Sequence, residues 1–323
     1  MGIEVIKPGL STTVQDQGRP GYYHIGIPVS GGMDLLALSA ANRLVGNDPG
    51  AAVLEAVFLG PELAFTRDAL VAVTGAEMPP KVDGGERPGW TAFAVRAGQV
   101  LSFGFLKTGA RAYIAVSGGI DVPLVLGSRS TYALGALGGH QGRKLQERDA
   151  LPLGEPRPAA EGRSIPERLR RAPGAPAELR MLPGLYWHRI TEASGRTFLD
   201  DTWKVAPEAD RIGYRFRSGR PLDFVPREPP FGAGSDPSNI VDACYPYGSI
   251  QVPGGTEPIV LHRDAVSGGG YFMVGTVISA DMDLIGQLQP HMPARFVAVT
   301  MEQALQARAE RRATLAAIDA ALA

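Results

Sequence analysis

Small sets of polar residues stand in glycine-rich parts of this sequence. Carboxylate, hydroxyl and guanidinium groups in such surroundings can hold a small ligand, because glycine lets the backbone approach it closely. The sets are Asp16 with Arg19, the run Ser128–Thr131, and Gln251 with Asp264. They indicate recognition of a polar or anionic group by hydrogen bonds.

Structural roles stay open for several similar residues. Asp34 stands at the predicted start of a helix, where its carboxylate could cap the first turn instead of binding a ligand. Asp210 and Arg211 could form a plain ion pair. The tetrapeptide Val-Ser-Gly-Gly begins at residues 29, 116 and 266. These copies are either three similar strand exits or three loops that offer backbone N–H groups to an anion.

Motifs of a self-sufficient active site are missing from the sequence. It contains no Walker-type phosphate loop, no dinucleotide-binding glycine spacing, no nucleophile elbow and no setting for a biotinylated lysine. Its five histidines form no zinc-binding pattern, so no metal is expected. The chain is therefore predicted to be one part of an enzyme that needs a partner subunit.

Composition and charge narrow the class of protein. Glycine (41 residues) and proline (27 residues) are abundant, which favours many short strands joined by tight turns. The net charge of −1 gives no support to a nucleic-acid partner. No apolar stretch is long enough to span a membrane. Cys244 is the single cysteine, and the N-terminus lacks a signal-peptide pattern, so a cytoplasmic address is expected.

A change of composition marks the expected domain boundary. The length of 323 residues fits about two domains, and between residues 152 and 179 prolines alternate with arginines, as in a linker. The expected organisation is a mainly β chain with strand-rich domains at 1–155 and 178–300, a linker at 156–177 and a helix at 301–323. Thr300 and Gln303 form a capping-box pattern before that helix. A further helix is predicted at Asp34–Val45.

Several longer motifs resemble one family. They are Pro8–Asp16, Gly18–Tyr22, Gly26–Asp34, Asn42–Asn47, Leu54–Glu55, Ala115–Pro123, Leu126–Thr131, Asp210–Tyr214, Gly248–Pro253 and Thr276–Asp281. With them the sequence resembles the biotin-dependent carboxyltransferase family. That family includes one subunit of the bacterial ATP-dependent 5-oxoprolinase, the kinase-inhibitor-antagonist type, and the allophanate-hydrolase-subunit-2 region of urea carboxylase.

The resemblance implies a fold, partners and cofactors. The fold would be a pair of cyclophilin-like β-barrels, and the partner would be related to kinase-inhibitor or allophanate-hydrolase-subunit-1 proteins. In the oxoprolinase system a lactam-utilisation-type subunit joins, and ATP bound by the complex drives the opening of 5-oxoproline to glutamate. In the urea carboxylase relatives the fold accepts a carboxyl group from carboxybiotin, which a biotin carrier on another chain would bring here.

The resemblance also assigns roles to the candidate residues. Asp264 and Arg129 are the expected catalytic residues, and Arg129 or Arg211 would stabilise charge that develops on the amide. The expected substrate-binding residues are Asp16, Arg19, Ser30, Asp34, Glu55, Ser130, Arg211 and Gln251.

One run departs from the oxoprolinase pattern and keeps three functions open. Oxoprolinase-type members carry Asp-Arg-Gln-Thr-Thr-Gly-Gly-Tyr-Pro in the second barrel, whereas Asp264 is followed here by Ala-Val-Ser-Gly. Loss of such hydrogen-bonding groups changes which substrate a site accepts. The runs Tyr22–Pro28 and Leu137–His140 are closer to urea carboxylase. The default function is a 5-oxoprolinase subunit. The alternatives are a biotin-dependent urea or amide carboxyltransferase and a non-catalytic regulator that sequesters its partner.

Overall fold

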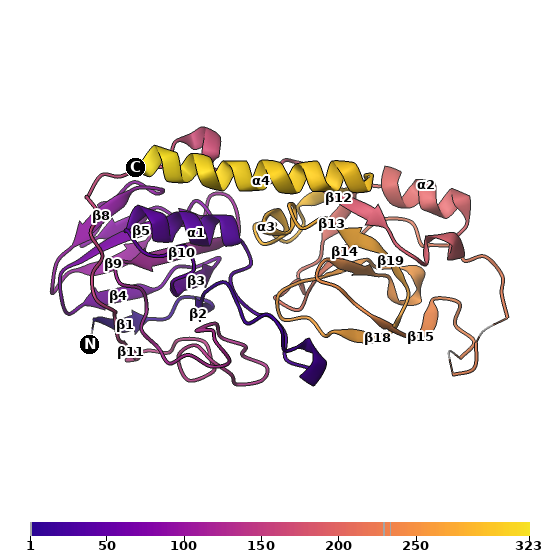
Figure 1. Ribbon diagram of the computed structural model, residues 1–323, viewed down its shortest axis with the longest axis horizontal. Helices are drawn as coiled ribbons and strands as arrows, with labels where there is room; N and C mark the ends of the chain where they lie inside the picture. The colour runs from indigo at the N-terminus through magenta and orange to yellow at the C-terminus, as the bar shows by residue number, and fades with distance from the viewer. Residues whose placement is uncertain (1, 229, 233) are drawn as a thin grey trace. The chain divides into compact units, whose positions relative to one another are not determined.

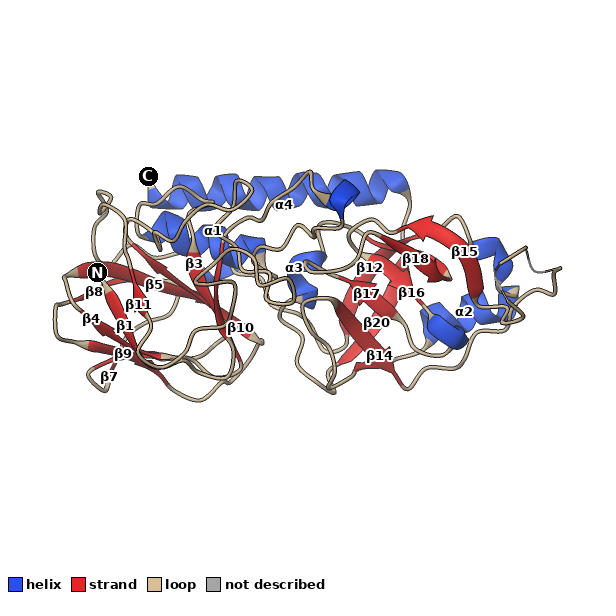
Figure 2. Cartoon of the chain, turned by 90° about the horizontal axis from the view of Figure 1, so that it is seen from below, coloured by secondary structure: helices blue, strands red, loops and turns tan. Residues whose placement is uncertain are grey.

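Strands form most of the regular structure in the computed structural model, which describes residues 2–228, 230–232 and 234–323. The predicted mainly β fold with few helices is confirmed (Figure 2). The chain divides into two units. Unit 1 comprises the N-terminal residues up to Pro20, Val29–Ala172 and Ala313–Ala323, and unit 2 comprises Gly21–Pro28 and Pro173–Arg312.

Unit 1 contains two sheets (Figure 1). The first has, in spatial order, β11 (Ala150–Leu151), β1 (Ile3–Lys7), β4 (Glu62–Phe65), β9 (Val100–Phe103), β6 (Pro80–Val82) and β7 (Gly85–Glu86). The second has β2 (Thr12–Gln15), β3 (Val53–Val57), β10 (Arg111–Val116), β5 (Ala69–Gly75) and β8 (Ala92–Val95). All of their pairings are antiparallel, and most neighbouring strands are far apart in the sequence, so long-range pairing builds both sheets.

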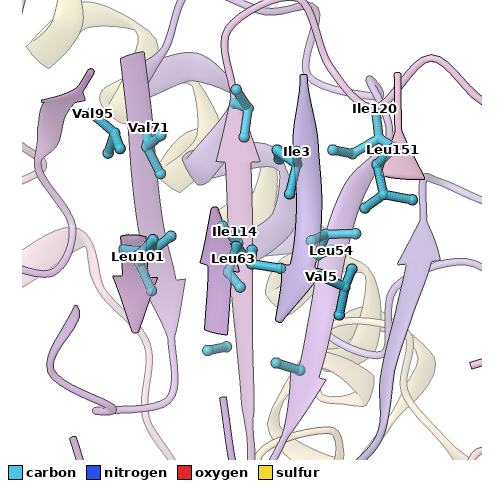
Figure 3. Packing of buried hydrophobic residues seen from close by; sticks show 14 of the residues in the cluster. Ile3, Val5, Leu54, Leu63, Val71, Val95, Leu101, Ile114, Ile120 and Leu151 are labelled. Carbon is cyan, nitrogen blue, oxygen red and sulfur yellow. The ribbon is translucent and has the colours of Figure 1, made fainter. Parts of the chain in front are cut away.

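The two sheets of unit 1 enclose one hydrophobic core. Ile3 and Leu63 come from the first sheet, and Leu54 and Ile114 come from the second (Figure 3). Successive side chains of a strand point to opposite faces, so alternate apolar residues turn one face of each sheet toward this core.

The outer face of the second sheet is also covered. Helix α1 (Leu35–Leu44) and the end of α4 (Met301–Leu322) share a cluster with Tyr113 of β10, and Ile318 of α4 is fully buried there. All six residues of β10 are buried as a result, since a strand covered on both faces has no solvent side. Helix α1 is the helix predicted at Asp34–Val45.

The proline- and arginine-rich stretch runs along unit 1. Arg163 O accepts a hydrogen bond from Ala92 N of β8 at 2.8 Å, and Ile165 is fully buried. The guanidinium of Arg170 lies 5.7 Å from the ring centroid of Trp90. These contacts cover the edge strand β8, whose free N–H and C=O groups would otherwise invite pairing with another chain.

Unit 2 is built on a closed barrel. Its strands are, in spatial order, β12 (Ala177–Pro183), β19 (Met273–Val277), β16 (Ser249–Gln251), β17 (Ile259–Leu261), β14 (Gly213–Arg217), β13 (Trp203–Val205) and β20 (Pro293–Ala298). Parallel pairing of β12 with β20 closes the ring. Closure leaves the barrel without edge strands. A separate two-stranded sheet pairs β15 (Asn239–Cys244) with β18 (Gly268–Tyr271).

Helices seal and extend this barrel. Helix α2 (Glu192–Asp200) packs on β20 through Phe198, whose ring stacks on Phe296 at 4.9 Å between centroids. Helix α3 is Met282–Ile285, and single 3-10 turns occur at Tyr23–Ile25, Glu167–Leu169, Trp187–Arg189 and Pro253–Gly255. The predicted capping box before α4 is present, with Thr300 N donating to Gln303 Oε1 at 2.9 Å and Gln303 N to Thr300 Oγ1 at 3.3 Å. Among the described residues, no helix is long and apolar enough to cross a bilayer.

Candidate functional site

Asp16 is the centre of a hydrogen-bond network in unit 1. It follows β2 directly, and its carboxylate accepts from Gly18 N at 2.8 Å and from Arg129 N at 2.6 Å. The hydroxyls of Ser128, at 2.6 Å, and Ser130 donate to the same carboxylate. Four donors on one buried carboxylate fix the loop 128–131 against the loop after β2, so Asp16 organises this region.

Arg19 is held in the same network. Only 1% of it is exposed, and Nη2 donates to Ser130 O while Nε donates to Val125 O at 3.4 Å. Gly138 packs directly on this arrangement, because a Cβ there would overlap Ser130 O and lie 2.6 Å from Arg19 Nη2. The glycine is needed for close approach, and the guanidinium of Arg19 braces the loop.

Ser30 stands out in the adjoining loop. Arg19 N donates to Val29 O at 2.7 Å and Gly32 N donates to Asp16 O at 2.9 Å, which ties this loop to the Asp16 network. Ser30 adopts a φ of +54° and is fully buried, and its hydroxyl has no hydrogen-bond partner among the described residues. A strained backbone and an unsatisfied buried hydroxyl are both costly, and such costs gather at functional sites.

Asp34 and Glu55 belong to a second network. The Tyr113 hydroxyl donates to Glu55 Oε2 at 2.7 Å and accepts from Asp34 N at 2.7 Å, and Met33 N donates to Glu55 Oε2 at 2.8 Å. Burial, together with the nearby Glu55 and Asp34 charges, raises the pKa of Tyr113 well above its usual value. The Asp34 carboxylate accepts from Ala37 N at 2.9 Å and so caps α1.

Arg129 has two separate functions in the loop. Its backbone N–H binds Asp16, whereas its side chain leaves the network, with Nε donating to Val122 O at 2.7 Å and Nη2 to Asp121 Oδ1 at 2.8 Å. One third of the side chain is exposed. The unused face of this guanidinium is therefore available to a ligand.

Two expected site residues of unit 2, Arg211 and Asp264, meet at the ends of two paired strands. Gly213 of β14 is opposite Leu261 of β17, which brings Arg211 and Asp264 together. Arg211 Nε lies 2.8 Å from Asp264 Oδ2, and Nη2 lies 3.3 Å from Oδ1. Asp210 takes no part in this pair, since its Oδ1 accepts from Ile212 N and Gly213 N. Asp264 is thus a nearly buried carboxylate held by a two-point contact.

Gln251 lies on the same barrel and makes a different contact. It sits in β16 opposite Ile259 and forms a hydrogen bond with Tyr245. Burial raises the pKa of Tyr245, although its bonds to the Tyr271 backbone and to Gln251 oppose the rise.

Three residues near Asp264 were not predicted from the sequence as site residues: Arg263, Tyr247 and Tyr23. Arg263 is 9% exposed, and its guanidinium lies 4.7 Å from the ring centroid of Tyr247. Burial raises the pKa of Tyr247 to about 12. Tyr23 joins unit 2 through the segment Gly21–Pro28, where the Ser267 hydroxyl donates to Tyr23 O at 3.5 Å. The one available signal was the position of Arg263 beside Asp264.

Two of the three Val-Ser-Gly-Gly segments use their backbone N–H groups within the protein. Gly32 N donates to Asp16 O, Gly118 N to Asn47 Oδ1 at 2.8 Å and Gly119 N to Val116 O. The third copy lies in unit 2 and includes the start of β18. Because these N–H groups bind the protein itself, the first two segments do not fit the phosphates of ATP. In the described part of the chain, no three acidic, cysteine or histidine side chains are grouped to hold a metal ion.

A cavity of about 560 Å³ adjoins the Asp16 network in unit 1. Val122, Val125 and the glycine-rich loop 136–142 line it. Nε2 of His140, on that loop, lies 3.3 Å from Asp149 Oδ1. A two-point bond from Arg143 lowers the pKa of Asp149 to about 2, assisted by Gln146 N and the nearby His140. The apolar lining suits a small ring better than a charged group.

The family of the chain follows from comparison with known proteins. Residues 25–298 match the family model described as "Carboxyltransferase domain, subdomain A and B". The chain therefore belongs to this carboxyltransferase-domain family, which confirms the resemblance seen in its motifs.

Relatives come from two kinds of enzyme. The chain is 35% identical to the 5-oxoprolinase subunit designated C of Escherichia coli, over 96% of this chain and 95% of that protein. It is 33% identical to urea amidolyase of Saccharomyces cerevisiae, over 98% of this chain but only 18% of that protein. The crystal structure of Kluyveromyces lactis urea carboxylase superposes with a TM-score of 0.93 at 32% identity, covering 100% of this chain and 30% of that one.

Proposed function

We propose that this chain is a subunit of a heteromeric ATP-dependent enzyme that opens a cyclic amide, with 5-oxoproline as the default substrate and glutamate as the product. The similarity to the Escherichia coli 5-oxoprolinase subunit carries the proposal, because it extends over nearly the whole of both chains. The same similarity extends to the corresponding 5-oxoprolinase subunit of Haemophilus influenzae, at 31% identity.

The chemistry assigned to this chain is recognition of the amide. Asp264 accepts the amide N–H, while Arg211 keeps the carboxylate oriented. In unit 1, the exposed face of the Arg129 guanidinium is assigned separately to an anionic group of a ligand. Asp16, Arg19 and Ser130 act indirectly, since their hydrogen bonds hold the loop that carries Arg129.

Other components belong to other chains of the complex. ATP, which activates the amide, is assigned to the complex because the first two Val-Ser-Gly-Gly loops of this chain are unsuited to it. The proposed partners are an allophanate-hydrolase-subunit-1-like or kinase-inhibitor-like subunit and a lactam-utilisation-type subunit. The cytoplasm is the proposed compartment.

Carboxyl transfer to a urea-like amide is the second candidate. Two observations favour it: the fold superposes closely on urea carboxylase, and alanine, valine and serine follow Asp264 where the oxoprolinase pattern has hydrogen-bonding residues. In that case carboxybiotin on a separate carrier would supply the carboxyl group.

Reconstitution distinguishes the two reactions. The chain is purified with its endogenous partners, and the complex is assayed for ATP-dependent glutamate release from 5-oxoproline. Recovery of a lactam-utilisation-type partner with glutamate release supports the first function. Recovery of a biotinylated carrier with urea-dependent ATP hydrolysis supports the second. No glutamate release with all subunits present would rule out 5-oxoproline.

A matched pair of variants tests the site itself. Asp264→Asn should lower turnover at least about a hundredfold, as expected when a positioned carboxylate is lost. Asp200→Asn removes the same charge from an exposed position of unit 2 and should leave turnover unchanged. Equal activity of both variants would show that Asp264 is not catalytic.

A further inference from the structure

Arg263 is a nearly buried cation whose side chain forms no hydrogen bond or ion pair with any described residue. Its Nε is buried without a partner, and 9% of the residue remains exposed. Burying a guanidinium is costly unless an anion or hydrogen-bond acceptors compensate it. Stacking on Tyr247 supplies part of that compensation, at 4.7 Å from the ring centroid.

The carboxylates around Arg263 are already occupied. Asp264 accepts both of its contacts from Arg211, and Asp210 accepts from backbone N–H groups. Asp283 lies 2.6 Å from Arg311 Nε. Each of these carboxylates therefore already has its donors, and the charge of Arg263 has no carboxylate partner among the described residues.

Neighbouring rings hold the guanidinium of Arg263 in place. The hydroxyl of Tyr247 lies 3.5 Å from His262 Nε2, which in turn lies 3.1 Å from Met282 O, so this ring is fixed from the barrel side. Burial raises the pKa of the Tyr23 hydroxyl above its usual value. The charge of Arg263 lowers this pKa and the charge of Asp264 raises it, so both groups lie near Tyr23. A neutral Tyr23 hydroxyl can donate a hydrogen bond to an anion beside Arg263.

We propose that Arg263 binds a carboxylate of the ligand, so that unit 2 recognises an amide that carries a negative charge next to the amide group. The planar fork of arginine matches a carboxylate with two parallel hydrogen bonds, and its stacked position is fixed before binding. That the ligand is an amide rests on the function proposed above. The carboxylate requirement rests on Arg263 alone, and it favours 5-oxoproline over urea, which has no charge.

Two ligands that differ only in the carboxylate test this inference. Binding of 5-oxoproline and of 2-pyrrolidinone, the same ring without the carboxylate, is measured by calorimetry on the full chain, alone and with its co-purified partners. The wild-type protein should bind 5-oxoproline at least about tenfold more tightly, as a charged hydrogen-bonded pair warrants. Arg263→Gln should reduce this ratio to about one, and Arg263→Lys should give an intermediate ratio because a point charge lacks the fork.

The control and the fold check use other positions and another measurement. Arg295→Gln removes the same charge from an exposed site on β20 and should leave the ratio unchanged. Thermal unfolding establishes that each variant is folded. If Arg263→Gln does not fold, the affinity ratio of the two ligands in Arg263→Lys decides the test. Equal binding of the two ligands by the wild-type protein, or an unchanged ratio in a folded Arg263 variant, would overturn the proposal.

Failure of this inference and failure of the proposed reaction give different results. A complex that releases no glutamate but keeps an Arg263-dependent ratio rules out the reaction and retains the carboxylate site. A complex in which Arg263→Gln releases glutamate with an unchanged KM retains the reaction and rules out the carboxylate site.

Discussion

Arg211 and Asp264 form a two-point ion pair across the ends of β14 and β17, with Nε 2.8 Å from Oδ2 and Nη2 3.3 Å from Oδ1. The pair lies 53 residues apart in the sequence, and the register of the two strands brings it together. Its side chains are 19% and 7% exposed, so water screens the attraction only weakly.

Removing either partner of this pair should destabilise the protein. Arg211→Gln or Asp264→Asn should each lower the free energy of unfolding by about 1–3 kcal/mol, because the remaining charge loses its partner in a poorly hydrated site. The double variant should lower the free energy of unfolding by less than the sum of the two single variants. The matched control is Arg220 with Asp201, a similar contact whose arginine is 62% exposed, where a coupling below about 1 kcal/mol is expected. Urea unfolding of the two cycles makes the comparison, and equal couplings would contradict it.

The buried carboxylate of Asp16 should contribute more to stability than the half-exposed carboxylate of Asp121. Asp16→Asn replaces one acceptor oxygen by an amino group that faces N–H and O–H donors, and a loss of roughly 3 kcal/mol is expected from the unsatisfied donors. Asp121→Asn alters only the half-exposed contact to Arg129 and should cost less than about 1 kcal/mol. Denaturant unfolding measures both losses of stability. Hydrogen exchange at the Arg129 amide should accelerate in Asp16→Asn only.

Ser30 should show opposite effects on stability and function. Ser30→Gly removes the cost of a φ of +54° and an unsatisfied buried hydroxyl, so stability should rise by about 0.5–1 kcal/mol. Turnover should fall if the hydroxyl contacts the substrate. Ser218→Gly is the control, because that serine, outside the site, has a φ of +76°. It should gain stability with no change in turnover, and a parallel result at Ser30 would remove it from the site.

Stability should depend on the ionisation of Asp149. Its folded pKa of about 2 lies below the usual value, so the stabilisation is complete above about pH 4 and is lost as the pH falls toward 2. The contribution at neutral pH is about 2 kcal/mol, and about half of it should remain near pH 3. Urea unfolding of the wild type and of Asp149→Asn between pH 7 and pH 3 measures the difference. A difference that stays constant over this range would refute the assignment.

The hydroxyl of Tyr113 should matter although its ring is already buried. Tyr113→Phe removes the hydroxyl that accepts from Asp34 N and donates to Glu55 Oε2, which keeps its bond from Met33 N, and this loss in a site closed to water should cost about 2 kcal/mol. Tyr132→Phe removes a hydroxyl with no hydrogen bond among the described residues and should be nearly neutral. Thermal or urea unfolding compares the two, and similar effects would indicate that the network contributes little.

Local features were predictable from the sequence because their causes are local. The helix α1, its cap at Asp34 and the capping box of Thr300 and Gln303 each depend on residues within four positions of one another. The abundance of glycine and proline likewise indicated short strands joined by tight turns.

The site was predictable only as separate pieces. Asp16 and Ser130 were both candidates, but their contact spans 114 residues and depends on where two loops lie in the folded unit. The burial of Arg263 could not be predicted either, because in the sequence it looks like an ordinary arginine. Only the folded barrel shows that its guanidinium is enclosed and has no carboxylate partner among the described residues. Tyr23 could not be predicted as a neighbour of Asp264, because nothing in the sequence indicates that Gly21–Pro28 joins the other unit.

That exchange of segments bears on how the protein can be made. Unit 2 includes the eight residues Gly21–Pro28, and unit 1 includes Ile318, so each unit is assembled from separate stretches of the chain. Domains of many proteins fold in order during synthesis, but here unit 1 lacks a buried residue of its core until Ile318 has been made, after all of unit 2. Residues 1–172 expressed alone would therefore lack Ile318, a buried residue of their own core, and residues 173–323 expressed alone would lack the segment Gly21–Pro28 of their own unit.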